Sequence, residues 1–141
     1  MSAIKNKGTI GALNFCHINA ISITNESIKS NLVTIKRVSD LNRNPKNSAD
    51  TKEIRFIYEA RKLLEDNKKI PPKTIHQKNS TIAYFPIITN NMCLQCHGSA
   101  ETDIRDNVYR KIQALYPEDK AVGYRENQLR GIWVVRMTNE K

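Results

Sequence analysis

Long apolar runs, aromatic side chains and cysteines are all scarce in this chain of 141 residues. No run of about 18 apolar residues occurs, so the sequence predicts no membrane-spanning segment. The opening residues, MSAIKNKGTIG, lack the apolar region and cleavage site of an export signal. Two expectations remain open: a cytosolic chain, or an exported one whose signal lies outside the numbered residues. Aromatic residues make up only 6%, and no basic stripe is interleaved with them, so the net charge of +9 does not indicate nucleic-acid binding.

The composition that remains is typical of one soluble domain. Hydrophobic residues make up 39% and charged residues 26%, and the length suffices to bury a core. We therefore predict a single domain over residues 1–141, with residues 1–7 disordered or extraneous to it. The positive charge is distributed unevenly along the chain. Residues 1–80 hold 15 Lys and Arg against 7 Asp and Glu, and so carry most of the net charge. An anionic cofactor or an acidic partner is favoured.

Apolar periodicity predicts a mixed α+β domain, a small antiparallel sheet flanked by helices. The expected elements, in chain order, are a long helix over 8–30, a strand over 31–39, an ordered loop over 40–50, a helix from 51 to about 67, a strand over 81–88, a loop with the cysteine motif, a short helix ending at Pro117, and a strand over 129–138. Asp50 and Glu53 have the spacing of a capping box before the second helix. Pro86 indicates an edge strand or a bulge.

Two of the three cysteines stand in the segment Cys93-Leu94-Gln95-Cys96-His97. A structural zinc site needs four ligands and usually two such pairs, and the chain has one pair. A thioredoxin-like dithiol is expected to open a helix after a strand in a βαβ unit. Cys-x-x-Cys-His is instead the attachment signature of c-type haem: two thiols add to the two vinyl groups, and the next residue places its imidazole on the iron. We therefore predict one covalently attached haem c, with Cys93 and Cys96 as attachment sites and His97 as axial ligand. Gly98 then lets the backbone leave the porphyrin without a Cβ clash.

Cys16, the third cysteine, has two interpretations that the residues leave open. Cysteine is among the most buried residue types, so Cys16 can simply belong to the core. A cysteine thiolate is also an established haem ligand. The neighbouring His17 could ligate the iron instead, Met137 and His76 are further alternatives, and Met92 is too close to the attachment segment to reach the opposite face.

Four ordered blocks make the chain resemble a family of exported bacterial PAS-like c-type haem domains, long catalogued as a domain of unknown function. The blocks are NFCHINA, KRVSDLNRNPKNSAD, CLQCHG and LYPEDKAVGYRENQLRGIWVV. The resemblance implies a PAS-like fold with a long N-terminal helix, and Cys16 and His97 as the axial pair. It also implies a periplasmic or otherwise exported protein. The chain departs from the family pattern at Ala49 and Lys52 and at Asn127-Gln128, which fall in predicted loops.

Haem propionates suggest a role for the arginines in these blocks. A guanidinium binds a carboxylate through two parallel charge-assisted bonds. Arg37, Arg43 and Arg130 are the candidate propionate ligands, and Asn44, with Ser39, is expected to hold the loop through backbone bonds. The ordinary alternative is that each arginine is a solvated surface residue.

A six-coordinate iron favours two functions over catalysis. In the first, the domain senses redox state or a diatomic gas such as CO or NO, and release of Cys16 changes the packing of the first helix. In the second, it is an electron-transfer cytochrome whose basic region steers an acidic redox partner. An enzyme would need an open coordination position and a distal base, for which only His17 offers itself, so we expect none. By analogy with PAS-like modules, the first helix could pair with that of a second copy.

Overall fold

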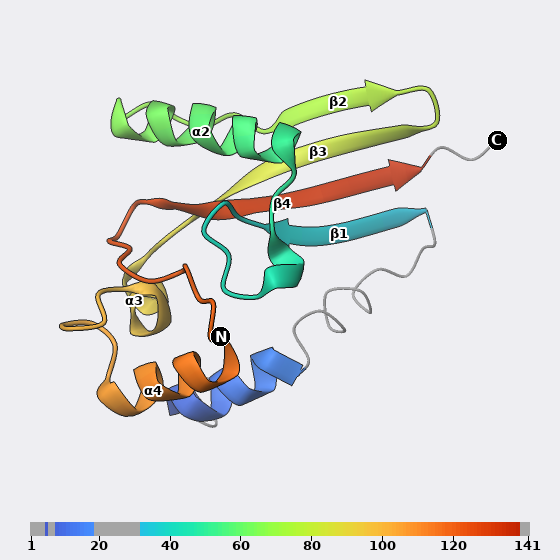
Figure 1. The fold of residues 1–141 in the computed structure, drawn as a ribbon. Coiled ribbons are helices and arrows are strands. Elements are labelled where there is room, and N and C mark those ends of the chain that lie inside the picture. The colour runs from blue at the N-terminus through green and yellow to red at the C-terminus, as the bar shows by residue number, and fades with distance from the viewer. Residues whose placement is uncertain (1–4, 6–7, 19–31, 139–141) are drawn as a thin grey trace.

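The computed structural model describes residue 5, residues 8–18 and residues 32–138. One antiparallel sheet of four strands forms its centre, in the order β1-β4-β3-β2 (Figure 1). The strands are β1 (Val33–Val38), β2 (Lys73–Gln77), β3 (Ser80–Ile88) and β4 (Leu129–Thr138). The helices are α2 (Thr51–Glu65), α3 (Asn91–His97) and α4 (Asp106–Leu115), with a 3₁₀ turn, η1, over Pro45–Asn47. The predicted α+β class is confirmed.

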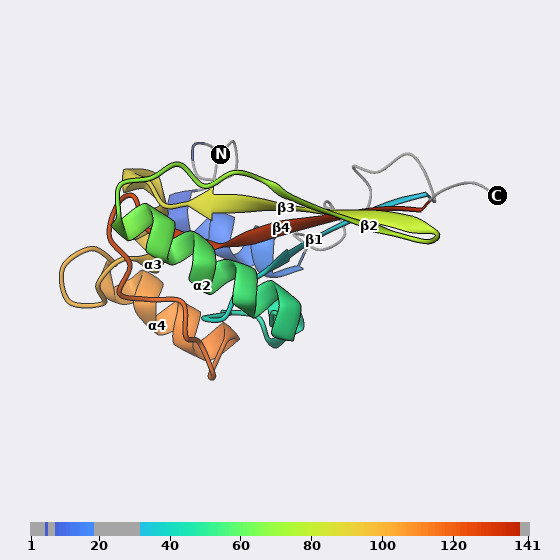
Figure 2. The same cartoon turned by 90° about the horizontal axis from the view of Figure 1, so that it is seen from above.

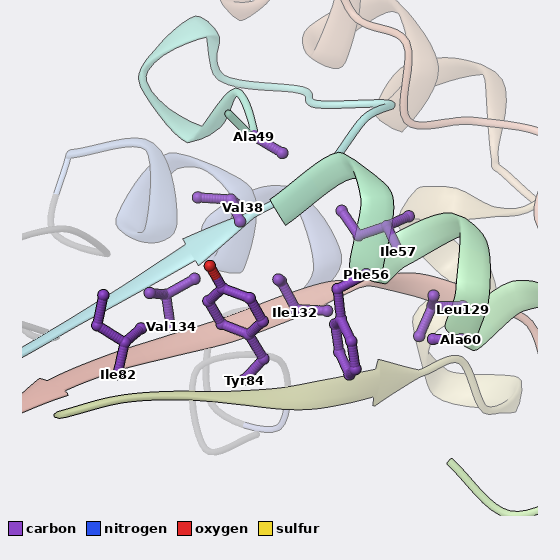
Figure 3. Close-up of a cluster of buried hydrophobic side chains, with 10 residues drawn as sticks. All are labelled: Val38, Ala49, Phe56, Ile57, Ala60, Ile82, Tyr84, Leu129, Ile132 and Val134. Atoms are coloured by element: carbon purple, nitrogen blue, oxygen red, sulfur yellow. The ribbon is translucent and has the colours of Figure 1, made fainter. Parts of the chain in front are cut away.

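Helix α2 packs along one face of the sheet, as the view from above shows (Figure 2). Alternation along the strands sends every second side chain to this face. Figure 3 shows the resulting core, which combines residues from β1, β3 and β4 with Phe56, Ile57 and Ala60 of α2. The rings of Phe56 and Tyr84 lie 5.4 Å apart between their centroids. The predicted alternation in β4 is confirmed, because Ile132 and Val134 are buried on this face.

The start of α2 shows why its prediction from the sequence held. The Asp50 carboxylate accepts hydrogen bonds from the backbone N–H groups of Lys52 and Glu53, and Glu53 accepts one from the N–H of Asp50. The predicted capping box is therefore present. Glu53 is almost fully buried and also forms an ion pair with Lys36 on β1, with N and O 2.7 Å apart. The cap thus ties α2 to the edge strand.

A second core joins the N-terminal helix (residues 8–18) to α4. Leu13 packs with Ile104, Val108 and Ile112, all buried. Both helices lie beyond the β1 edge of the sheet (Figure 1). The predicted continuation of this helix over residues 19–30, like residues 1–7 apart from residue 5, lies outside the described residues. Within the described part of the chain, no helix has the length and apolar character needed to cross a membrane.

Two details of the sheet differ from expectation. Strand β2 was not predicted, since Ile75 is the sole apolar residue in its five positions. Strand β3 is an inner strand and not the predicted edge. Its pairing with β2 extends only to the pair Lys73–Tyr84, so Pro86 has no partner residue on β2. Pro86 therefore needs to donate no hydrogen bond on that side. The register shifts between Ile87 and Ile88, where a bulge was one of the two predicted alternatives.

Candidate functional site

The Cys-x-x-Cys-His segment forms helix α3 rather than the predicted loop, and this corrects the sequence interpretation. Asn90 caps the helix, because its side-chain oxygen accepts from the backbone N–H of Cys93. The spacing of three residues therefore places Cys93 and Cys96 on the same side of a helix, next to each other. Both thiols are free and half-buried. Although α3 follows strand β3, the sheet is antiparallel, so the βαβ setting of a thioredoxin-like dithiol is absent from the described residues.

His97, the last residue of α3, is held by the backbone of a distant loop. Its Nδ1 lies 2.7 Å from the carbonyl oxygen of Ala121. A carbonyl can only accept, so Nδ1 carries the proton and donates it. Within the described part of the chain, Nε2 makes no hydrogen bond, and its lone pair is available. The backbone N–H of Tyr124 donates to the carbonyl of His97 at 2.8 Å, so the same loop also holds the backbone of His97.

Burial and neighbouring charge keep His97 neutral. Desolvation, followed by the charges of Arg130 and Arg43, lowers the pKa of His97 from 6.5 to about 3, although part of the residue remains accessible, and the bond to Ala121 opposes this shift. The Arg130 Nε lies 3.4 Å from Nδ1. Because Nδ1 of His97 already donates its proton to Ala121, it cannot accept a hydrogen bond from Arg130. The contact therefore brings the positive charge of the guanidinium close to the N–H of the imidazole. A neutral imidazole with a free Nε2 is the form that binds a metal.

Arg130 is held in place by the loop after β1. Its Nη1 donates to Ser39 Oγ at 2.9 Å and to the Leu41 carbonyl at 3.1 Å. Its guanidinium also lies 5.4 Å from the centroid of the Tyr124 ring. The structure therefore places Arg130 beside His97. The predicted role of Arg130 as a propionate ligand stays a prediction.

Arg43 is buried and bonded to the protein itself. Its Nη2 lies 2.6 Å from the Cys96 carbonyl oxygen and 3.2 Å from that of Ala121. It also forms an ion pair with Asp119 at 3.0 Å. These contacts favour a structural task over the predicted propionate bond, because the carboxylate partner is already supplied by the chain.

The two remaining predicted residues of this region make no direct contact with His97 among the described residues, although the Arg37 charge adds to the lowering of the His97 pKa. Arg37 is exposed on β1, with its guanidinium 5.3 Å from the centroid of the Trp133 ring. Asn44 caps η1, accepting from the N–H of Lys46 at 3.0 Å. The expectation that Asn44 holds the loop through backbone bonds agrees with this contact.

Cys16 lies close enough to Cys96 to affect the pKa of its thiol. Burial raises the pKa of the Cys96 thiol, the Arg43 charge opposes the rise, and the proximity of Cys16 adds to it. The N-terminal helix contacts α3 where Thr9 Oγ1 donates to Gln95 Oε1 at 3.2 Å. Cys16 itself is exposed, which speaks against the interpretation as a core residue.

The alternative ligands are placed less favourably. The His17 ring packs edge-on against Tyr116, with the centroids 4.9 Å apart. His76 and Met137 lie on β2 and at the end of β4, at the end of the sheet away from α3 (Figure 1). In the described ranges, no three His, Cys, Asp or Glu side chains gather as a metal site.

Sequence reasoning missed Asp119, Ala121 and Tyr124. The first two hold Arg43 and His97, and the Tyr124 ring lies 6.4 Å from that of His97, edge to face. The buried Tyr124 hydroxyl has no hydrogen-bond partner among the described residues. Ala121 acts through its backbone carbonyl, which every residue has, so no side-chain signal could have found it.

Comparison with known proteins assigns the family. The family model described as Tll0287-like matches residues 2–138, nearly the whole chain. The chain belongs to the Tll0287-like family. Among solved structures, the crystal structure of the cyanobacterial haem protein Tll0287 matches this Tll0287-like chain with a TM-score of 0.69. The two are 22% identical, and the match covers 89% of this chain and 73% of the other. No curated protein matches the chain. The PAS-like fold predicted for this Tll0287-like chain is thereby confirmed.

The residues at α3 fit a c-type haem. Two free thiols lie one helical turn apart, and the adjoining imidazole is neutral with its Nε2 lone pair free. That imidazole is oriented by a backbone carbonyl, a common partner of histidines that bind metals in proteins. A cavity of about 240 Å³ beside the C-terminal part of α2 includes Tyr124 in its wall but none of the three motif residues, so we do not assign it to the cofactor.

Proposed function

We propose that this chain is a mono-haem c-type cytochrome domain that senses redox state or a diatomic gas. The observation that carries the proposal is His97, with Nδ1–H donated to Ala121 and Nε2 free, directly after two thiols on α3. Each thiol would add across one vinyl group, sulfur to one carbon and hydrogen to the other, forming a thioether. When bound, the haem supplies a reversible one-electron couple and, after loss of an axial ligand, a position for CO or NO.

We propose Cys16 as the second axial ligand. Its exposed thiol lies on the N-terminal helix, close enough to Cys96 to act on the pKa of that thiol. A thiolate ligand donates electron density and favours the ferric state, so the reduction potential is expected to be low. Because thioether formation of this kind takes place outside the cytoplasm, we further propose a periplasmic or otherwise exported location.

The position of Cys16 on the N-terminal helix supports the sensing proposal. The contacts of the N-terminal helix with the remainder of the described chain include the packing of Leu13 and Ile10, the His17–Tyr116 ring pair and the Thr9–Gln95 hydrogen bond. Release of Cys16 would remove a further tether and leave these contacts to hold the helix. The helix is therefore the element whose packing both ligation states can bias. It could then pass the change to a second copy of the chain.

Ferrous spectra with CO or NO test this proposal. In the wild type, gas binding should displace Cys16 and abolish the thiolate signature in the optical spectrum of the ferrous protein. Cys16→Ala should lack that signature from the start and bind gas faster, whereas the matched control His17→Ala should behave as the wild type. If Cys16→Ala retains the wild-type spectra, Cys16 is not the ligand.

Electron transfer to an acidic partner is the alternative function. The exposed basic side chains on α2, on β2 and between them are Lys52, Arg55, Lys62, Lys68, Lys69 and Lys73. Lys68 and Lys73 are paired with the carboxylates of Asp66 and Glu59. Such a surface speeds encounters with an acidic protein and does so less at high salt. A reduced protein that binds neither gas, yet exchanges electrons rapidly and in a salt-dependent way with an acidic redox protein, would favour this function over sensing.

A further inference from the structure

Arg43 joins two parts of the site that are far apart in sequence. It belongs to the loop after β1, yet its guanidinium reaches the carbonyl of Cys96 on α3 and that of Ala121, which holds His97. Side-chain accessibility is about a tenth for Arg43 and less for Asp119, its ion-pair partner. A buried charge pair of this kind is retained at a desolvation cost, so a further role is worth testing.

We infer that Arg43 is a positioning residue that sets how His97 is oriented and how strongly it donates to the iron. This inference rests on the proposed function, in which His97 is an axial ligand. The decisive geometry is a shared acceptor: Ala121 O accepts from His97 Nδ1 at 2.7 Å and from Arg43 Nη2 at 3.2 Å.

The shared carbonyl links the charge of Arg43 to the basicity of His97. A strong acceptor at Nδ1–H pulls the proton away from the ring and makes Nε2 a better electron donor. A cation on the same carbonyl weakens it as an acceptor for the second donor. Arg43 therefore limits the anionic character of His97, and its loss should stabilise the ferric state.

Asp119 holds both Arg43 and Ala121 in position. One carboxylate oxygen pairs with Arg43 and the other accepts from the N–H of Ala121 at 2.8 Å. Ala121 is thus held at its N–H by Asp119 and at its carbonyl by Arg43 and His97. An arginine that merely anchored the loop would not require this second contact on the histidine's own acceptor.

The test compares two pairs of buried or half-buried charges in the haem-loaded protein. Arg43→Met/Asp119→Asn removes the pair at the site without changing the net charge. Arg61→Met/Asp40→Asn is the matched control, because Arg61 bonds both oxygens of Asp40 at 3.1 and 2.9 Å and neither residue contacts α3. Reduction potentials and ferric paramagnetic resonance spectra are measured for both variants and the wild type.

We expect the Arg43 pair variant to shift the ferric-to-ferrous ratio at a fixed potential about tenfold toward ferric, which is about 59 mV for one electron. Its ferric g values should change, because they report the orientation and donation of the axial imidazole. The Arg61 pair variant should match the wild type in both. Arg43→Lys keeps the charge on a side chain that is one bond shorter than the path to Arg43 Nη2, which makes all three contacts, so it should shift both readouts less, in the same direction.

Two results separate the inference from the function beneath it. A haem-loaded wild type whose Arg43→Lys and Arg43 pair variants keep the wild-type potential and g values overturns the inference alone. A matured wild type that carries no covalent haem overturns the proposed function. If the pair variant does not fold, Arg43→Lys alone decides, because an unchanged potential there contradicts the shared-acceptor argument.

Discussion

Gly131 on β4 has no room for a side chain, and replacing it by alanine gives a strong test of the structure. A Cβ at this buried position would clash with the carbonyl oxygen of Val38 on β1 and would lie 3.2 Å from the Cβ of Ser39. The close atom is backbone, so strand β1 itself must move. The same movement would disturb the hydrogen bond from Ser39 Oγ to the carbonyl of Arg130, which is 2.8 Å long.

The expected cost follows from these two terms. Forcing a methyl group into a packed core costs roughly 1–3 kcal/mol, and weakening one hydrogen bond costs about 1 kcal/mol. Gly131→Ala should therefore lower the free energy of unfolding by about 3 kcal/mol and the melting temperature by about 10 °C. Circular dichroism of the haem-loaded protein during thermal and guanidinium unfolding measures both.

Gly123→Ala is the matched control. Gly123 has a φ of +82°, but a Cβ there would meet nothing within 4 Å. Its replacement should cost only the left-handed backbone penalty, about 1–2 kcal/mol. If Gly131→Ala proves no more destabilising than Gly123→Ala, the register between β1 and β4 is wrong.

Three further predictions concern the core, the cap and the site. Ile112→Ala, at a fully buried position on α4, should lower the free energy of unfolding by about 2–5 kcal/mol, and a loss under 1 kcal/mol in guanidinium unfolding would contradict the packing of the second core. Asp50→Ala should cost about 1–2 kcal/mol by removing the capping box, whereas Asp50→Ser should restore most of the loss; equal melting temperatures for the two would speak against the cap. In haem-free protein (Cys93→Ser/Cys96→Ser), burial holds the folded-state pKa of His97 at about 3 against 6.5 unfolded, so its contribution to stability is present above 6.5 and is lost as the pH falls below it. Between pH 7 and pH 5 this loss should be about 2 kcal/mol in urea unfolding and should vanish in His97→Gln; equal losses with and without the histidine would refute it.

The sequence predicts well where the signal is local. The box of Asp50 and Glu53 and the helical spacing that follows define α2 without reference to the rest of the chain. The alternation of Ile132 and Val134 with Trp133 and Val135 likewise defines β4 over its full length. Strand β2 cannot be predicted in this way, because its one half-buried residue, Ile75, forms no alternating apolar pattern. Its conformation depends on pairing with β3.

The candidate attachment residues can likewise be found from a short stretch of sequence. The residues that hold them in place cannot, because they lie far away along the chain. Five consecutive residues identify Cys93, Cys96 and His97 as candidates, because thioether chemistry needs that spacing. The contacts of Arg43 with Cys96 and Ala121 span 53 and 78 residues of sequence. Only the packed structure distinguishes an arginine aimed at a propionate from one bonded to the chain's own carbonyls.

The central claim, covalent haem on α3, is tested most directly by the mass of the intact protein after expression with a c-type haem maturation system. The account predicts the chain mass plus one haem, retained after extraction with acidified organic solvent, in the wild type. It predicts the bare chain for Cys93→Ser/Cys96→Ser. A colourless wild type, or a pigment that the solvent removes completely, would contradict it.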